Sequence, residues 1–543
     1  MRISLAQLNY HIGNFDENFK SITKAIETAK IQNADLIIFS ELATIGYPPQ
    51  DLLYHDSFIK KNEALLRKIE ALADGITIII GSIKVNTDKK GKKLFNAAFT
   101  FQNKKCIHTA EKQLLPNYDI FDESRYFESG ANNDVITVGK FKIAVSVCED
   151  LWDVDDEELY KSGPMSKLIL QKPDIIVNIA ASPFSYTHQE KRAEILRRNA
   201  EKFDLPVIYV NQVGAHSELI FDGSSLLMNN KGDVIERLSF CKEQLFTFDS
   251  DILFQKTSKS IPKPDVAEQL HDSLVFGIKD FFEKQAFKKA ILGLSGGIDS
   301  ALVLVLAVKA LGKENVLPVL LPSEFSSQHS IDDSLALCEN LGVESHTISI
   351  KDLYSLVNQT LYPIFGETDF GVTEENLQSR LRGLILMAIS NKKGYILLNT
   401  TNKSEAAVGY GTLYGDLNGG LSVIGDLYKK HVYAISLYIN RESEIIPENI
   451  ITKEPSAELK PDQKDTDFLP DYDILDNILE SYIEKYMSAE AIISTFNYSP
   501  ETVNKVFSLV NRNEFKRYQM APVLRVTSKG FGIGRRYPLV AKY

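Results

Sequence analysis

The feature that most constrains the fold is a repeated alternation of short apolar, β-branched runs with amphipathic segments. Helical spacing of apolar residues occurs at 17–33, 57–73 and 190–203. The apolar runs of the first half, which read as strands, are residues 3–8, 35–39, 76–85, 96–101, 142–147, 174–179 and 206–211. Buried strands separated by helices predict an α/β domain, here an α-β-β-α sandwich.

The second half repeats the alternation in a simpler order. Strand-like runs at residues 289–294, 315–321, 345–350 and 395–399 are separated by helical spacing at 267–285, 300–311 and 332–341. Such a βαβ series predicts a doubly wound parallel sheet of the Rossmann-like kind. The last 80 or so residues mix the two patterns and give no clear assignment.

A polar stretch with two prolines separates the halves. Residues 256–264 include Pro262 and Pro264 and cannot continue a core strand. We therefore predict a first domain at residues 1–255, a linker at 256–268 and a second domain at 269–543.

The composition of the chain limits the kinds of partner that it can be expected to bind. The chain has 61 Lys and Arg against 72 Asp and Glu, a net charge of −11, and no basic run longer than a pair or two, which argues against a nucleic-acid partner. Its four cysteines, Cys106, Cys148, Cys241 and Cys338, form no CxxC pair, which fits a reducing compartment. No apolar run is long enough for a membrane helix or a signal peptide. These features predict a cytoplasmic protein with no membrane partner.

Three residues in the first half have the chemistry of a covalent amidase. Glu41 and Cys148 each follow an apolar run, and Lys112 precedes a Leu-Leu-Pro segment. Alone, each has an ordinary structural interpretation: a small core cysteine, a loop glutamate and a surface lysine. Reactive groups of α/β sheets stand at the carboxyl ends of strands, however, which is where Glu41 and Cys148 are expected.

With their flanking residues, these segments resemble the nitrilase, or carbon–nitrogen hydrolase, superfamily over about residues 1–250. The steps Ser40-Glu41, Lys112…Pro116 and Cys148-Glu149-Asp150 match its Glu–Lys–Cys triad in order and approximate spacing. The resemblance implies that Cys148 is the nucleophile and Glu41 the general base and acid. Lys112 and the backbone N–H of Glu149 would stabilise the oxyanion. We also expect the nearby lysine and the strand-end position to favour the Cys148 thiolate.

The same resemblance implies a glutamine site formed by Tyr118, Ser182 and His188. Relatives carry Lys or Arg at the position of His188, so this chain departs from the pattern where the substrate carboxylate would bind. An imidazole loses its charge near neutrality, which predicts pH-sensitive glutamine binding. The alternative is that Lys191 or Arg192, on the following helix, supplies the positive charge.

A second motif lies at residues 292–300, Leu-Gly-Leu-Ser-Gly-Gly-Ile-Asp-Ser, between a strand and a helix. Adjacent glycines and a helix N-terminus can direct N–H groups at a phosphate, although a short Gly-Gly turn is also a common structural feature. The GxxxxGK[ST] pattern of Walker-type NTPases is absent. The glycines at 409–415 and 530–534 do not fit the GxGxxG spacing and setting, so a Rossmann dinucleotide site is not expected.

This motif resembles the SGGxDS signature of the N-type ATP pyrophosphatases, and residues 265–540 resemble the NAD synthetase domain. The resemblance implies Mg²⁺ at Asp299 and Glu405, and deamido-NAD binding by Asn376, Glu405 and Lys516, with Asp416 and Lys429 as weaker candidates. The residues implied for ATP, the co-substrate, are Gly293, Leu294, Ser295, Gly296, Gly297, Ile298, Asp299, Ser300 and Thr400. The acidic run 153–158 we interpret as a solvated face.

The two resemblances imply complementary halves, because an amidase releases the ammonia that an adenylating ligase consumes. Together they predict hydrolysis of L-glutamine to glutamate and ammonia, adenylation of deamido-NAD by ATP, and amidation to NAD with release of AMP and pyrophosphate. We expect small-molecule partners and a homo-oligomer. The alternatives are an enzyme with a different acceptor, such as a GMP or asparagine synthetase, and a non-catalytic nucleotide sensor with a vestigial amidase.

Overall fold

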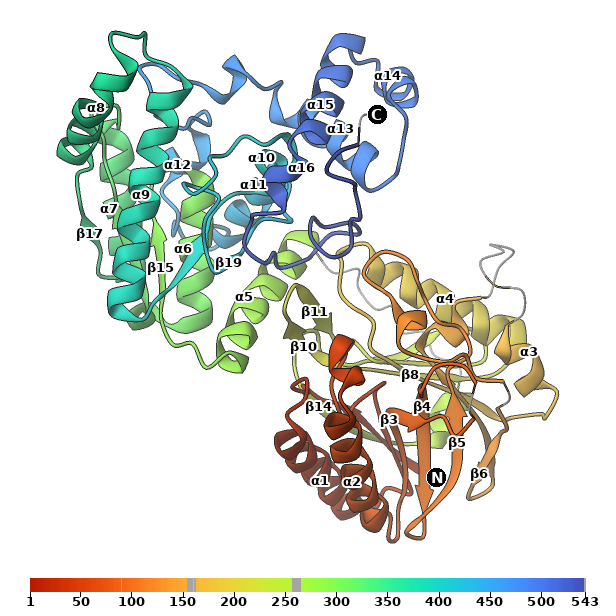
Figure 1. Cartoon of the computed structure of the whole chain (residues 1–543). Helices are drawn as coiled ribbons and strands as arrows, with labels where there is room; N and C mark the ends of the chain where they lie inside the picture. Colours follow the sequence, from red (N-terminus) through yellow and green to blue (C-terminus); the bar gives the residue numbers. More distant parts are fainter. Residues whose placement is uncertain (89, 132, 154–159, 161–162, 256–264, 542–543) are drawn as a thin grey trace. The chain divides into compact units, whose positions relative to one another are not determined.

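The chain divides into two compact units, Met1–Lys263 and Pro264–Tyr543. The structure is a computed structural model, and it describes residues 1–88, 90–131, 133–153, 160, 163–255 and 265–541 (Figure 1). Most of the predicted linker and residues 154–158 of the acidic run lie outside the described residues. The predicted domain limits therefore stay a prediction.

The described part of the first unit contains two six-stranded sheets. The first has the order β14-β1-β2-β3-β4-β5, with bounds β14 Gln244–Asp249, β1 Arg2–Gln7, β2 Leu36–Phe39, β3 Thr77–Val85, β4 Leu94–Gln102 and β5 Lys105–Glu111. The second has the order β13-β12-β9-β8-β7-β6, with bounds β13 Val234–Arg237, β12 Leu226–Met228, β9 Val207–Asn211, β8 Ile175–Ala180, β7 Phe141–Val147 and β6 Ile136–Val138. A hairpin of β10 (Val213–His216) and β11 (Leu219–Asp222) lies outside both sheets.

Side-chain alternation along the strands creates the layers of this unit. On β2, Ile38 belongs to the core between the two sheets, whereas Ile37 and Phe39 pack toward helices. Helices α1 (Phe15–Ile31) and α2 (Asp56–Leu72) cover the first sheet, and α3 (Pro164–Ile169) and α4 (His188–Phe203) contact the second. The predicted α-β-β-α sandwich is confirmed.

Among the described residues of the second unit, five parallel strands form one sheet in the order β17-β16-β15-β18-β19. Their bounds are β17 His346–Thr347, β16 Val316–Leu320, β15 Ala290–Gly293, β18 Ile396–Asn399 and β19 Leu421–Ser422. The flanking helices are α5 Val266–Lys284, α6 Ile298–Leu311, α7 Gln328–Leu341, α8 Lys351–Phe365, α9 Val372–Lys393, α10 Lys403–Val408, α11 Lys429–Ile439 and α12 Glu448–Thr452. The predicted parallel-sheet domain is confirmed, although the strand expected at residues 345–350 has only two residues.

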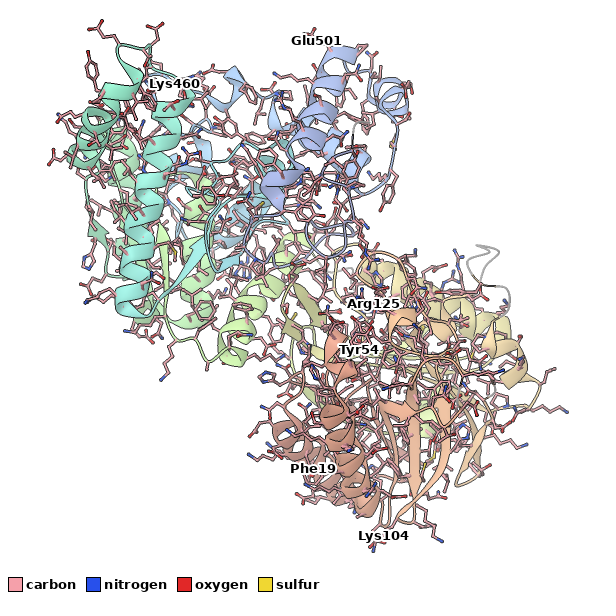
Figure 2. All side chains as sticks on the ribbon, in the orientation of Figure 1. Phe19, Tyr54, Lys104, Arg125, Lys460 and Glu501 are labelled. Carbon is pink, nitrogen blue, oxygen red and sulfur yellow. The ribbon has the colours of Figure 1, made fainter. Side chains whose placement is uncertain are left out.

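The C-terminal residues, which the sequence left unassigned, form helices with a hydrophobic core of their own. This core includes Leu479 and Val506, and it also contains Ala407 of α10. The helices are α13 Tyr472–Ile483, α14 Ala489–Phe496, α15 Pro500–Arg512 and α16 Glu514–Arg517. Charged side chains such as Lys460 and Glu501 lie on the outside (Figure 2). In the described ranges, no helix is long and apolar enough to cross a membrane.

Candidate active sites

The first unit brings Glu41, Lys112 and Cys148 together in its interior. Glu41 follows β2, Lys112 follows β5 and Cys148 follows β7. The Lys112 Nζ donates to Glu41 Oε1 at 2.8 Å, and the three residues are 0%, 1% and 6% exposed in that order. Residues from three strands, far apart in the sequence, thus form one buried ionic cluster.

Glu41 is held rigidly. Its Oε1 accepts from Asn96 Nδ2 at 2.7 Å, and its Oε2 accepts from the backbone N–H of Ala181 at 2.9 Å. Gly81 allows strand β3 to pass close to the Glu41 backbone, because a Cβ at position 81 would lie only 2.6 Å from the Glu41 Cα. The carboxylate is therefore fixed in place before any substrate arrives.

The structure adds a residue that the sequence analysis missed. Glu123 Oε1 accepts from Lys112 Nζ at 2.8 Å and from the Tyr47 hydroxyl at 2.9 Å. Burial raises the pKa of Glu123 to about 7, although Lys112 opposes the shift. Lys112 is thus shared by two buried carboxyls. Nothing in the sequence around Glu123 distinguishes it from a surface glutamate.

The expectation of a thiolate at Cys148 is wrong for the resting site. Burial raises the pKa of the Cys148 thiol well above its ordinary value, the charge of Glu41 raises it further, and Lys112 lowers it only in part. Cys148 also has a positive φ of 44°, which is uncommon for a residue with a side chain. The thiol is therefore protonated at rest, and it would need a base in order to act as a nucleophile.

The three residues expected to bind glutamine form two contacts. The Tyr118 hydroxyl donates to Glu149 Oε1 at 2.9 Å, and Ser182 Oγ lies 3.3 Å from His188 Nε2. The His188 ring also lies against Trp152, with ring centroids 5.1 Å apart. The role of each residue toward glutamine stays a prediction.

Of the two alternative cations, Arg192 already has a partner. It is buried and donates to both carboxylate oxygens of Asp222, at 3.1 and 2.7 Å. It is therefore unsuited to bind a substrate carboxylate. Lys191 is exposed and stays an alternative.

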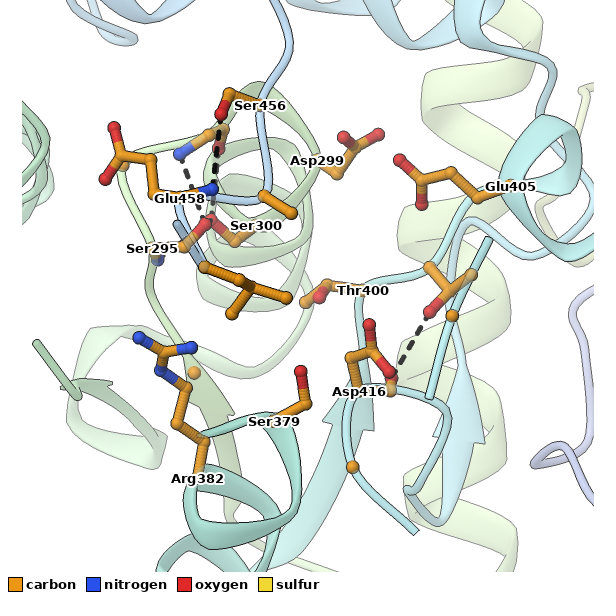
Figure 3. Close-up of a pocket in the computed structure, with 18 of the residues that line it drawn as sticks. Ser295, Asp299, Ser300, Ser379, Arg382, Thr400, Glu405, Asp416, Ser456 and Glu458 are labelled. Carbon is orange, nitrogen blue, oxygen red and sulfur yellow. Dashed lines mark hydrogen bonds between the residues drawn. The ribbon is translucent and has the colours of Figure 1, made fainter. Parts of the chain in front are cut away.

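The second unit contains a cavity of about 450 Å³ at the carboxyl ends of its strands. Figure 3 shows Asp299, Thr400 and Glu405 directed into it. Every residue implied for ATP, deamido-NAD or Mg²⁺ lines this cavity: Gly293, Leu294, Ser295, Gly296, Gly297, Ile298, Asp299, Ser300, Asn376, Thr400, Glu405 and Lys516, with the weaker candidates Asp416 and Lys429. Their individual roles stay predictions.

The loop from Ser295 to Ser300 has a shape that depends on glycine. Gly296 has a φ of +79°, and a Cβ there would lie 2.4 Å from the carbonyl oxygen of Ser330. The Ser300 hydroxyl accepts from the backbone N–H of Ser295 at 3.2 Å, which closes the turn at the start of α6. A tight turn before a helix N-terminus suits an anion.

The Asp299 side chain at the end of this loop forms a charged cluster with Glu405 and Lys429. The Lys429 Nζ lies 2.5 Å from Asp299 Oδ2 and 3.6 Å from Glu405 Oε1, and Asn402 donates to Asp299 Oδ1 at 2.9 Å. Burial and the neighbouring charge of Asp299 raise the pKa of Glu405 well above its ordinary value, against the effect of Lys429. Two half-buried carboxyls thus share one ammonium group.

The residues expected near deamido-NAD are held by the segment at 409–416. The Thr412 hydroxyl donates to Asn376 Oδ1 at 2.6 Å, and the Thr412 N–H donates to Asp416 at 2.5 Å. Lys516 Nζ donates to the carbonyl oxygens of Gly409 and Gly411 at 2.7 and 2.8 Å. The sequence analysis missed other residues that line the cavity, among them Arg382, Lys453, Ser456 and Glu458.

The two units define a carbon–nitrogen hydrolase joined to an NAD synthase. The carbon–nitrogen hydrolase family matches residues 2–252, and the NAD synthase family matches residues 270–520. The chain belongs to the glutamine-dependent NAD(+) synthetases. Such a synthetase from Synechocystis sp. is 45% identical over 552 residues, with 100% of this chain and 99% of that protein covered. One from Acinetobacter baylyi is 41% identical, with 99% and 98% covered.

Solved structures agree. A glutamine-dependent NAD+ synthetase from Acinetobacter baumannii, in complex with ADP, is 38% identical with a TM-score of 0.78, covering 99% of this chain and 98% of that one. The enzyme from Cytophaga hutchinsonii has a TM-score of 0.85 at 21% identity, covering 100% and 98%, which shows the shared fold.

Proposed function

We propose that this chain releases ammonia from glutamine at Cys148 and uses it to convert deamido-NAD, activated by ATP, into NAD. The observation that carries the assignment is the buried Glu41–Lys112 ion pair, whose two charges act in opposite directions on the pKa of the Cys148 thiol. The cavity around residues 295–300 supports the second half of the reaction.

In the glutaminase half, Glu41 takes the Cys148 proton as the sulfur attacks the amide carbon. The raised pKa of the thiol makes this transfer necessary. Lys112 and the N–H of Glu149 hold the oxyanion, and Glu41 then protonates the departing ammonia. Water discharges the thioester, with Glu41 again as base. Tyr118, Ser182 and His188 bind the α-amino and α-carboxylate groups of glutamine.

In the synthetase half, ATP lies along residues 293–300 with Thr400, and its phosphates face the N–H groups of the loop. The Acinetobacter baumannii relative is in complex with ADP, which supports binding of an adenine nucleotide by this chain. Asn376, Glu405 and Lys516 bind deamido-NAD. Adenylation of its nicotinate carboxylate releases pyrophosphate, and ammonia then displaces AMP.

The site fits a magnesium ion at Asp299 and Glu405. Mg²⁺ uses one or two protein carboxylates together with substrate phosphates. Asp299 and Glu405 lie 2.5 and 3.6 Å from the single Lys429 ammonium, so two carboxylates face one cation and a dication would balance the remaining negative charge. Among the described residues, no group of three or more His, Cys, Asp or Glu side chains could hold a metal on its own, so the phosphates of ATP complete the ligand set. When bound, the ion would neutralise charge between those phosphates.

We further infer a homo-oligomer in the cytoplasm. Large apolar side chains on α8 and α9, including Leu356, Ile364, Val372 and Leu384, are exposed and suit a second copy of the chain. All four cysteines are free, in keeping with a reducing compartment. Sedimentation of the purified protein measures the first inference, and a monomer at micromolar concentration contradicts it.

The decisive experiment compares nitrogen sources. NAD formation from deamido-NAD and ATP is measured with glutamine and with ammonium in the wild type, Cys148→Ala and the exposed-cysteine control Cys106→Ala. We expect Cys148→Ala to lose only the glutamine-driven reaction. Equal loss of both reactions would contradict two separate sites, and absence of NAD formation by the wild type would refute the function.

A further inference from the structure

Arg382 has a charged side chain in the cavity wall that the reaction described above does not use. It lies on α9, and its side chain extends beside Ser379 and toward the loop that contains Ser295 (Figure 3). Its Nε donates to the carbonyl oxygen of Leu321 at 3.0 Å. Within the described part of the chain, the guanidinium forms no other hydrogen bond and no ion pair.

Arg382 is half-buried in the cavity wall, and its guanidinium is partly desolvated but not neutralised. Burial lowers its pKa to about 10, and the carboxylates of Asp416 and Glu458 attract it only from beyond ion-pair distance. It remains charged at neutral pH. The remaining N–H groups of Arg382 have no acceptor among the described residues, so a ligand that displaces water from this part of the cavity has to supply one.

The surroundings indicate which part of a ligand supplies that acceptor. The phosphate loop has its own backbone N–H groups, and three lysines, Lys429, Lys453 and Lys516, also line the cavity. Arg382 instead has apolar neighbours in the cavity wall: its Nε is bonded to Leu321, and Leu386 lies one turn later on α9. Other apolar side chains that line the cavity include Leu294, Val319, Leu320 and Leu397. An apolar wall with one planar donor suits a flat heteroaromatic ring whose nitrogens accept hydrogen bonds.

We propose that Arg382 recognises the adenine base of ATP. One of its free N–H groups donates a hydrogen bond to a ring nitrogen of the adenine, while its Nε continues to donate to the carbonyl oxygen of Leu321. Arg382 is then a specificity residue, held in place by the end of β16. The inference rests on the proposed ATP site and goes further, because it assigns base recognition to one side chain. Such a site discriminates against a base that lacks the acceptor, since the buried donor is left unpaired.

The test uses ATP and its 1-deaza, 3-deaza and 7-deaza analogues, each of which lacks one ring nitrogen. Calorimetry measures their binding to the wild type, Arg382→Met and the control Lys392→Met, an exposed cation on the same helix. We expect one analogue to bind the wild type and the control about tenfold or more weakly than ATP. In Arg382→Met, ATP and that analogue should bind equally, while affinity for deamido-NAD is unchanged.

Two further arms separate this idea from its alternatives. Arg382→Met should bind adenosine more weakly than the wild type does, but it should bind pyrophosphate equally well. The reverse pattern would show that the guanidinium binds phosphate, and it would overturn the proposal. Equal binding of all four nucleotides by the wild type overturns it as well, whereas failure of ATP itself to bind the wild type refutes the ATP site. If Arg382→Met does not fold, Arg382→Lys keeps the charge without the planar fork and should also lose the discrimination.

Discussion

Replacing Lys112 with Met should destabilise the glutaminase unit by a predictable amount. The substitution keeps most of the side-chain volume but removes the one ammonium that Glu41 and Glu123 share. Both carboxyls are buried, so each loses its counter-charge. Removing one partner of a buried ion pair typically costs about 3–5 kcal/mol, and we expect the free energy of unfolding to fall by that amount.

Part of that cost should be recoverable. Adding Glu123→Gln to Lys112→Met removes one of the stranded charges, and the double variant should regain part of the lost free energy although it has one hydrogen-bonding pair fewer. The pH response has a definite sign. Burial raises the pKa of Glu123, and without Lys112 less opposes that shift, so the deficit of the single variant should shrink as the pH falls and a proton neutralises this carboxyl.

Urea denaturation followed by tryptophan fluorescence measures this directly, because Trp152 is the chain's one tryptophan and lies in the glutaminase unit. Ammonium-driven NAD formation serves as the control for the other unit. A loss below about 1 kcal/mol, or a double variant less stable than Lys112→Met, would refute the view that Lys112 neutralises two carboxyls.

Four other outcomes follow from the sites. A glutamine-like electrophile should label Cys148, whereas a simple alkylating reagent at neutral pH should label it slowly and faster as the pH rises, because its pKa is raised; mass spectrometry locates the adducts. In Asp299→Ala, the rate of NAD formation should fall about 100-fold with either nitrogen source, because adenylation precedes the attack of ammonia. Near-normal activity with ammonium would mean that Asp299 only stabilises the start of α6. Glutamine KM should rise with pH in the wild type and stay flatter in His188→Lys, and parallel curves would exclude His188 as the carboxylate's partner. Gly296→Ala should raise the ATP KM at least tenfold while glutaminase activity is unchanged, because its Cβ meets the Ser330 carbonyl; an unchanged KM would contradict the loop geometry.

The sequence predicts those parts of the molecule whose chemistry is tied to a local pattern. Cys148 and Glu41 follow apolar runs, and a parallel arrangement of β2 and β7 with their neighbours brings strand ends toward one edge of each sheet. The loop at residues 295–300 is recognisable because its glycines and its position before a helix are both local features.

The parts that sequence could not predict depend on long-range contacts. Glu123 looks like any charged loop residue until the fold places it 2.8 Å from Lys112. The Cys148 thiol looks activated by the nearby lysine, but burial outweighs that charge. Arg382 follows a run of charged and polar residues on an amphipathic helix. Only its hydrogen bond to the carbonyl oxygen of Leu321, directly after β16, shows that its side chain faces inward.

The protonated, buried state of Cys148 has a consequence for survival under oxidative stress. Peroxide attacks thiolates much faster than thiols, so a cysteine that ionises only when its substrate arrives is spared between turnovers. The exposed Cys106, which has no part in the proposed reaction, would meet an oxidant first. If Cys148 is the nucleophile as proposed, the burial that makes it depend on Glu41 would also protect it from oxidation between turnovers.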